Sequence, residues 1–191
     1  PAPLARRRRR TRAAFTACGR TRGPGRRAAN DPGLSGILGA KADAACLVGK
    51  TWDFHVDVAL EIPYTDNIAG IADSIAAVVA KKREALFDAE HFFDGYKANP
   101  DYALACIAAA HDAGASWLVL CATYGGTMPE DVSRAVAEVT AKRPASALAP
   151  HAHNHHPQPV PRSPAPPPGV TPHTHHHATA PRRRRCQPHP P

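Results

Sequence analysis

The stretch ALFDAEHFFDGY, residues 85–96, begins as a short apolar strand and then becomes densely polar. Asp88, Glu90, His91 and Asp94 fall within seven positions. A polar loop that only solubilises the end of a strand would have this composition. One wall of an active site would have it as well, because carboxylates such as Asp88 and Glu90 at a semi-buried strand end can act in proton transfer. Either carboxylate could instead hold an Arg or Lys structurally. The surrounding sequence bears on the choice between these two interpretations.

Short apolar runs alternate with helical patterns on both sides of this stretch. Ile68, Ile71 and Ile75 recur at helical spacing before it, and Asn99 with Pro100 opens a helix after it. The predicted strands begin at intervals of roughly 30–40 residues, the spacing of β-α-β units. In chain order we predict a strand at 45–49, a helix at 66–83, strands at 84–89 and 116–121 on either side of a helix at 99–114, a helix at 129–143 and a weaker strand at 146–154. The predicted fold class is α/β with a parallel sheet.

Reactive side chains follow each predicted strand at its carboxyl end. In a parallel barrel these ends converge on one mouth, whereas in an open sheet only the ends beside a switch point meet. Four such ends in succession favour a partial (β/α)8 TIM barrel, and they favour the active-site interpretation of residues 85–96. The residues are Lys50, Asp53 and His55; Asp88, Glu90 and His91; Thr123 with Gly125 and Gly126; and His151 with His153.

Charge and composition divide the chain into three parts. Residues 41–142 hold 8 of the 24 Lys and Arg but 15 of the 16 Asp and Glu, so this part has a net charge of −7 and the remainder +15. Residues 151–191 contain no Leu, Ile, Met, Phe, Tyr or Trp, and such a segment buries too little apolar surface to offset its ordering entropy. We expect a disordered Arg-rich segment at 1–12, a partial barrel domain at 13–154 and a disordered Pro-, His- and Arg-rich tail at 155–191.

Neither a membrane span nor a disulfide framework is indicated. The chain has no run of about 18 apolar residues and no apolar segment behind its basic N-terminus. Its five Cys show no repeating spacing, and Cys46, Cys106 and Cys121 lie within apolar runs, where buried thiols are expected. We expect a cytoplasmic protein without a membrane partner.

Three motifs remain open to two interpretations each. His151 and His153 in HAHN would face the same way on a strand and could bind one metal ion, or they could simply begin the His-rich tail. The glycines after Thr123 could allow close approach of a substrate carboxylate or could form only a turn. The Arg runs at 6–10 and 182–185 could bind nucleic acid, but no aromatic residues interleave with them, so solvated charge is favoured.

Four segments, in their order and spacing, resemble the citramalate synthases, which belong to the metal-dependent family of isopropylmalate and homocitrate synthases. They are GKTWDFHV (49–56), FDAEHFFDGYKANPDYAL (87–104), WLVLCATYGGTMP (117–129) and HAHN (151–154). TACGRTRGPGRRAANDPGL (16–34) resembles the strand and loop that precede them in those enzymes. The resemblance covers about residues 13–154.

This resemblance implies a (β/α)8 barrel of which the chain holds roughly strands three to seven. It implies condensation of acetyl-CoA with a 2-keto acid, here pyruvate, in isoleucine and leucine biosynthesis, and a homodimer in the full-length family. A divalent ion (Mg, Mn or Zn) would polarise the keto carbonyl while a base removes a proton from the acetyl methyl group. By the same resemblance Glu90 is catalytic, Thr123 and His91 bind substrate, and His151 and His153 bind the metal.

The sequence also departs from the family pattern. The Arg-Asp pair of the family's first strand has no counterpart, and CATYGG places Ala122 and Tyr124 where the family has an acid and an amide. After HAHN the composition turns to Pro, His and Arg, as in a truncated or frame-shifted gene. We therefore expect an incomplete metal site and an inactive copy of the enzyme. Polyanion or nucleic-acid binding by the Arg-rich tails is the alternative function.

Overall fold

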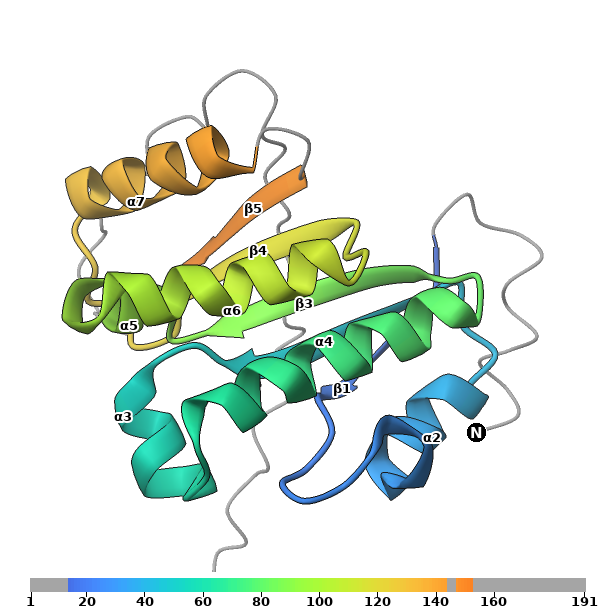
Figure 1. Cartoon of the computed structure of the whole chain (residues 1–191). Coiled ribbons are helices and arrows are strands. Elements are labelled where there is room, and N and C mark those ends of the chain that lie inside the picture. Colours follow the sequence, from blue (N-terminus) through green and yellow to red (C-terminus); the bar gives the residue numbers. More distant parts are fainter. Residues whose placement is uncertain (1–13, 144–146, 153–191) are drawn as a thin grey trace, which may run out of the picture.

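The computed structural model describes residues 14–143 and 147–152, which form a parallel sheet and a layer of helices (Figure 1). The strands are β1 (Thr16–Arg20), β2 (Ala44–Lys50), β3 (Glu84–Glu90), β4 (Trp117–Ala122) and β5 (Ala147–Ala152). The helices are α2 (Pro32–Gly39), α3 (Asp53–His55), α4 (Tyr64–Ala80), α5 (Phe92–Ala98), α6 (Pro100–Asp112) and α7 (Pro129–Lys142), with helical turns η2 (Ala28–Asn30) and η3 (Val56–Leu60). The predicted α/β class is confirmed.

The five strands lie in the sheet in their order along the chain, and every neighbouring pair is parallel. An open doubly wound sheet reverses its strand order at a switch point, whereas a barrel adds each strand beside the last. Among the described strands the order is therefore that of an arc of a (β/α)8 barrel. β1 and β5 form the two edges of this arc.

The two faces of the sheet differ because alternate side chains of a strand point to opposite sides. On one face, Leu47, Phe87, Leu118 and Leu120 are fully buried in the main core beneath the helices. Figure 1 shows α4 and α6 lying side by side across this face. The other face holds two small buried clusters, Ala44 with Cys46 and Leu86, and Val119 with Cys121 and Ala149. The polar ends of β2 and β3 lie on this second face.

Helix α6 has the boundary residues that its sequence predicts. The Asn99 side chain accepts a hydrogen bond from the N–H of Tyr102 at 3.1 Å, and Pro100 opens the first turn. Gly114 follows the helix with φ +98°, a left-handed conformation that suits glycine. The predicted helix at 99–114 is confirmed as Pro100–Asp112.

Three helical segments, α2, α3 with η3, and α5, were not predicted. They are 8, 8 and 7 residues long, and hydrophobic periodicity needs a window of about 11 residues or more to be read. Local hydrogen bonds stabilise α2 instead. The Asp31 carboxylate accepts the N–H of Leu34 at 2.9 Å and the N–H of Gly23 at 2.8 Å, which joins the helix to the loop after β1.

The segments expected to be disordered, 1–12 and 155–191, lie outside the described residues. Within the described part, no helix has the length and apolar character needed to cross a membrane. Cys46, Cys106 and Cys121 are buried free thiols, as their apolar surroundings in the sequence predict, and Cys18 is an exposed one.

Helix α5 packs directly on the loop after β2 at Gly95. A methyl group at Gly95 would lie 2.4 Å from the carbonyl oxygen of Thr51 and 2.8 Å from Cα of Trp52. Both are backbone atoms, so no change of rotamer could relieve the contact. Thr51 is itself held in place, because its N–H and its hydroxyl donate to the carbonyl of Glu90 at 3.2 and 2.8 Å. Gly95 thus allows α5 to hold the loops after β2 and β3 together.

We expect Gly95→Ala to destabilise the protein by about 2 kcal/mol or more, because overpacking against atoms that cannot yield is costly. Gly36→Ala is the matched control, since Gly36 is exposed in α2 and a methyl group there meets no atom within 4 Å. This control should stabilise the protein by about 0.5–1 kcal/mol. Urea unfolding followed by circular dichroism measures both changes, and equal midpoints for the two variants would contradict the close contact.

Candidate active site

The last residues of β2 and β3 form an ion pair at the carboxyl edge of the sheet. Lys50 and Glu90 are register partners on these parallel strands, on the face opposite the helices. Lys50 Nζ lies 2.6 Å from Glu90 Oε2, and the side chains are 27% and 28% exposed. Charge-assisted contacts of this length fix both groups in position. Glu90, the predicted catalytic residue, is thus the last residue of β3. It lies at the strand end that the sequence indicated.

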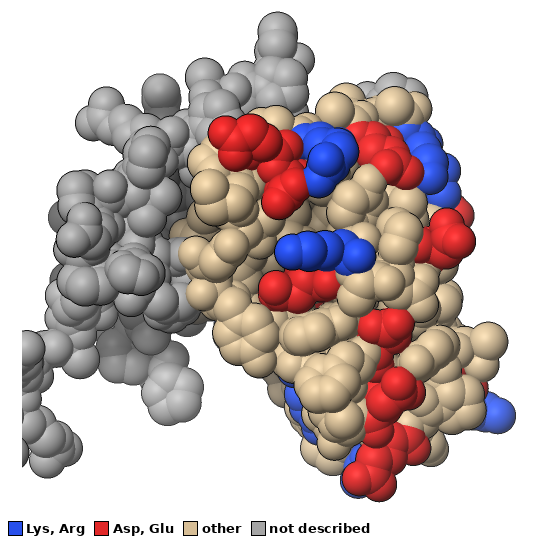
Figure 2. All heavy atoms as spheres, turned by 90° about the vertical axis from the view of Figure 1, so that its left-hand side faces the viewer, with Lys and Arg blue, Asp and Glu red and all other residues tan. Residues whose placement is uncertain are grey.

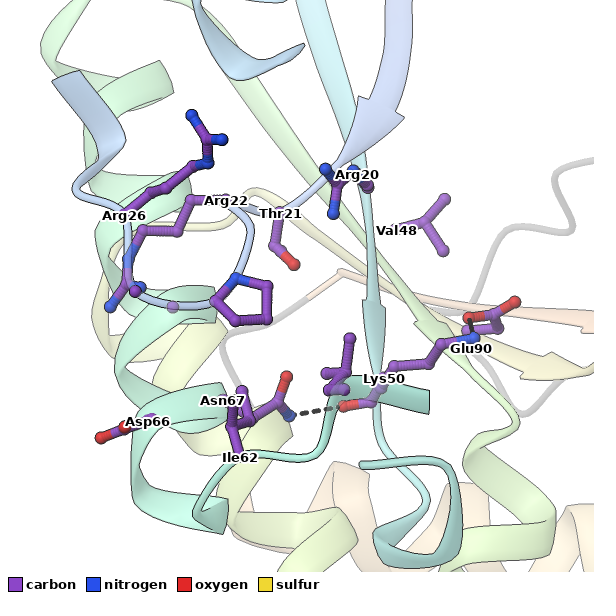
Figure 3. A pocket seen from close by; sticks show the side chains of 14 residues that line it. Arg20, Thr21, Arg22, Arg26, Val48, Lys50, Ile62, Asp66, Asn67 and Glu90 are labelled. Atoms are coloured by element: carbon purple, nitrogen blue, oxygen red, sulfur yellow. Dashed lines mark hydrogen bonds and ion pairs between the residues drawn. The ribbon is translucent and has the colours of Figure 1, made fainter. Parts of the chain in front are cut away.

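A cavity of about 500 Å³ opens beside this ion pair, between β1, β2 and α4 (Figure 3). Val48, Leu60 and Ile62 give it apolar walls. The charged residues that line it are Arg20, Arg22, Arg26, Lys50, Asp66 and Glu90. The cavity therefore combines a cationic lining with apolar surface, next to the candidate catalytic carboxylate.

Asn67 fixes the backbone on which Lys50 is mounted. Its side-chain amide donates to the carbonyl oxygen of Lys50 at 2.9 Å and to the hydroxyl of Tyr102 at 2.7 Å. Asn67 is 5% exposed, and burial raises the pKa of the Tyr102 hydroxyl, so that the hydroxyl stays protonated. This network joins α4, β2 and α6 beneath the cavity. No local sequence pattern indicates this role for Asn67, because its partners are 17 and 35 residues away in the chain.

The arginines of the cavity were also missed. Four arginines lie in residues 20–27, but these residues fall outside the acidic part 41–142, so their charge was counted with that of the tails. Arg22 is held by α4, since its Nε donates to Asp73 Oδ2 at 2.8 Å and its N–H donates to Ser74 Oγ at 2.9 Å. In the sequence these arginines look like part of the basic tails. Their distinct position is seen only in the structure, where the loop after β1 packs against α4.

His91 and Thr123, the predicted substrate-binding residues, are in contact. His91 follows β3 in a left-handed conformation with φ 58°, which costs a non-glycine residue about 1 kcal/mol or more. Its N–H donates to Thr123 Oγ1 at 2.9 Å, and its Nδ1 lies 3.2 Å from Asp94 Oδ2. The contact with Thr123 joins the ends of β3 and β4, and both contacts offset the cost of the turn.

An aromatic cluster covers this part of the edge. The ring of His55 packs edge-on against that of His91 at a centroid distance of 4.3 Å, and Tyr124 lies 4.4 Å from His91. Trp52 lies 4.8 Å from His55. Burial first, then the charges of His91 and Lys50, lower the pKa of His55, and its Nδ1 is buried without a hydrogen-bond partner. His55 is thus a neutral packing ring at neutral pH.

Not all the predicted residues gather at the ion pair. Asp53 accepts a hydrogen bond from Asn99 Nδ2 at 2.9 Å and so faces the start of α6. Asp88 lies within β3, where its Oδ1 is buried without a hydrogen-bond partner. His151 pairs in register with Cys121, so β4 separates it from the strand of Glu90. The ends of the strands lie along one edge of the sheet, but the side chains that they carry are spread along this edge and do not all meet.

The predicted metal site depends on a residue outside the described part. His153 lies beyond residue 152, and among residues 14–143 and 147–152 no group of three or more His, Cys, Asp or Glu side chains is arranged to hold a metal ion. The described donors alone do not fit a divalent cation. The assignment of His151 and His153 as ligands stays a prediction from the resemblance.

The lowered pKa of His55 predicts a pH dependence of stability. The unfolded chain binds a proton at His55 near pH 6.5, whereas the folded protein binds it only at lower pH. Stability from this group is therefore present above pH 6.5 and is lost as the pH falls towards the folded pKa. We expect His55→Gln to flatten this loss, and His111→Gln, on α6, to serve as the control. Urea unfolding between pH 5 and about 7.5 tests this, together with an NMR titration of the His55 ring; a pKa of 6.5 or above in the folded protein would contradict it.

Comparison with known proteins gives a partial match. No protein-family model matches the chain. It is 39% identical over 142 residues to the (R)-citramalate synthase of Aquifex aeolicus, which covers 74% of this chain and 27% of that protein. It is 47% identical over 124 residues to the (R)-citramalate synthase of Geobacter sulfurreducens, covering 65% of this chain and 23% of that protein. The matches span about a quarter of the length of these relatives.

Solved structures agree on the fold. The HMG-CoA lyase of Bacillus subtilis superposes with a TM-score of 0.59 at 16% identity over 73% of this chain and 45% of the lyase. The HMG-CoA lyase of Brucella melitensis gives 0.54 at 19% identity over 63% of this chain and 44% of the lyase. At these identities the likeness concerns the fold alone, and with the sequential strand order it confirms a partial TIM barrel. Over about two thirds of its length, this chain is similar in sequence to part of the (R)-citramalate synthases, as its motifs indicated.

Proposed function

We propose that this chain carries part of the active site of an acyltransferase that condenses acetyl-CoA with pyruvate. The observation that carries the proposal is the Lys50–Glu90 ion pair beside the cavity. Its two residues come from GKTWDFHV and FDAEHFFDGYKANPDYAL, two of the segments on which the resemblance rests. The similarity to (R)-citramalate synthases supports the substrates, acetyl-CoA and pyruvate.

In this proposal Glu90 accepts a proton from the acetyl methyl group. A general base must lie within hydrogen-bond reach of that proton, and Glu90 lines the cavity that would hold the thioester. The enolate then forms a carbon–carbon bond to the keto carbon of pyruvate, and water cleaves the thioester to give citramalate and CoA. Lys50, 2.6 Å from Glu90, places a positive charge where negative charge develops.

Thr123 and His91 are proposed to bind the carboxylate of pyruvate. Their mutual hydrogen bond holds them together at the ends of β3 and β4, and β3 is the strand that ends in Glu90. A divalent ion at His151 and His153 belongs to the same resemblance, and polarising the keto carbonyl is the chemistry that it would supply. The aromatic cluster of Trp52, His55 and Tyr124 would exclude water from this end of the site.

A chimera tests the function of the segment directly. Residues 16–152 would replace the matching segment of the Geobacter sulfurreducens enzyme, and release of CoA thiol from acetyl-CoA would be followed with and without pyruvate. We expect pyruvate-dependent release that falls by about 100-fold or more in Glu90→Gln, since a general acid–base residue contributes about 10²–10⁴-fold. Glu130→Gln, at an exposed position at the start of α7, is the matched control and should leave the rate unchanged. Equal rates for Glu90→Gln and the control would remove Glu90 from the mechanism.

We further propose that the 191-residue chain by itself does not make citramalate. Within the described residues the sheet is open at β1 and β5, and Ala122, at the position of the family's acid, is buried among helix-side core residues. The same assay should show no pyruvate-dependent release of CoA from the chain alone. Turnover that is lost in both Glu90→Ala and His153→Ala would contradict this.

A further inference from the structure

We propose that the cavity between β1, β2 and α4 binds the phosphate groups of an acyl-CoA thioester, with Arg20 and Arg26 as the cationic contacts. This assignment rests on the proposed function and adds to it the subsite that would distinguish a CoA thioester from a simpler one.

Two of the four cations of the cavity already have partners. Lys50 pairs with Glu90 at 2.6 Å, and Arg22 pairs with Asp73 at 2.8 Å. Within the described part of the chain, Arg20 and Arg26 form no ion pair with a carboxylate. The remaining acid of the lining, Asp66, lies on the far side of the cavity from Lys50 and Glu90 (Figure 3). The lining itself thus holds four cations and two acids; Arg20, whose charge also helps to lower the pKa of the buried Asp31 carboxyl behind it, and Arg26 are the cations left without an ion pair, which suits an anion.

The positive charge of the cavity is opposite in sign to the net charge of residues 41–142. Residues 41–142 have a net charge of −7, and Figure 2 shows acidic side chains, with some Lys and Arg between them, along the side of the molecule that faces left in Figure 1. Four arginines in residues 20–27 reverse that sign in one loop. Guanidinium groups match phosphate oxygens with two parallel hydrogen bonds, so clustered arginines favour phosphate over a single carboxylate.

The apolar walls favour a CoA thioester over free phosphate as the ligand of the cavity. Val48, Leu60 and Ile62 line the same cavity as the arginines, and Glu90 lies across it from Arg22 and Arg26 (Figure 3). Inorganic phosphate would gain nothing from apolar walls, whereas the pantetheine arm of CoA is largely uncharged and can bury apolar surface there. A volume of about 500 Å³ is within the usual range for a pocket that holds part of a cofactor-sized ligand. The arginine end would hold phosphates, and the Glu90 end would receive the acyl group.

Arginine footprinting on the full chain tests the site locally. Arg20 and Arg26 are both exposed, so phenylglyoxal can reach them, and mass spectrometry reports modification at each arginine separately. Acetyl-CoA should protect Arg20 and Arg26, whereas acetyl-pantetheine, which has no phosphate, should not. Arg134 on α7, whose side chain is 72% exposed, is the internal control and should stay unprotected. Protection confined to the arginines at 6–10 and 182–185 would overturn the proposal.

Affinity measurements on variants give the second readout. Arg20→Gln and Arg26→Gln should each weaken acetyl-CoA binding about tenfold, as expected for loss of a charge-assisted contact, and leave acetyl-pantetheine binding unchanged. Arg134→Gln removes one positive charge elsewhere and should change neither affinity. Because every variant keeps the Arg-rich tails, their contribution cancels in the comparison. Unchanged acetyl-CoA affinity in both cavity variants would overturn the assignment.

Binding of inorganic pyrophosphate distinguishes the two possible ligands that carry phosphate, a CoA thioester and a free polyphosphate. It should bind at least tenfold more weakly than acetyl-CoA, because it lacks the arm that meets the apolar walls. Equal affinity would show that the cavity serves free polyphosphate and would overturn the assignment to a thioester. None of these three measurements uses pyruvate or requires turnover, so failure of the proposed reaction and failure of this subsite are separate results.

Discussion

The parallel register between β2 and β3 is the constraint on which the candidate site depends. It pairs Ala44 with Glu84 and continues without a break to Lys50 and Glu90. Because side chains alternate along a strand, a shift of either strand by one residue would carry its own charged residue, Lys50 or Glu90, to the helix-covered face and separate the pair. Leu47 and Phe87, which are 0% exposed beneath the helices, oppose such a shift through their burial. The core and the ion pair are therefore two consequences of one register.

Rigid contacts behind the strand ends turn this register into a site. The hydroxyl of Thr51 joins the ends of β2 and β3, Gly95 lets α5 press on that joint, and Asn67 anchors the carbonyl of Lys50. Each contact uses backbone atoms or a buried amide, which leaves little freedom for the carboxylate of Glu90. A general base benefits from such fixed placement, because proximity and orientation contribute a large part of a rate. The loop after β1, with its exposed arginines, faces this rigid wall across the cavity.

The departures from the family pattern have different structural consequences. Tyr124 stands where the resemblance expects an amide, and its ring lies against His91 at the rim of the site. Ala122 stands where it expects an acid, and it is buried on the helix side of β4. Tyr124 therefore changes the shape and polarity of the site, whereas Ala122 removes a charge from a strand end. Both changes fall at the carboxyl end of β4, since Ala122 is its last residue and Tyr124 lies in the turn that follows, next to the strand that bears Glu90.

Local sequence determined the α/β class, the succession of strands, the ends of α6 and the position of Glu90 at a strand end. Each depends on residues within about 15 positions of one another, where periodicity, capping residues and glycine act directly. The tertiary structure decided what meets at the carboxyl edge: Asn67 beneath Lys50, the arginines of 20–26 across the cavity from Glu90, and His151 apart from both. These groups come from segments far apart in the chain, and only strand order and helix packing set the distances between them. The same polar residues at strand ends are compatible with many arrangements of these groups. Which strands pair depends on contacts between residues far apart in the chain, and no local sequence pattern determines these contacts.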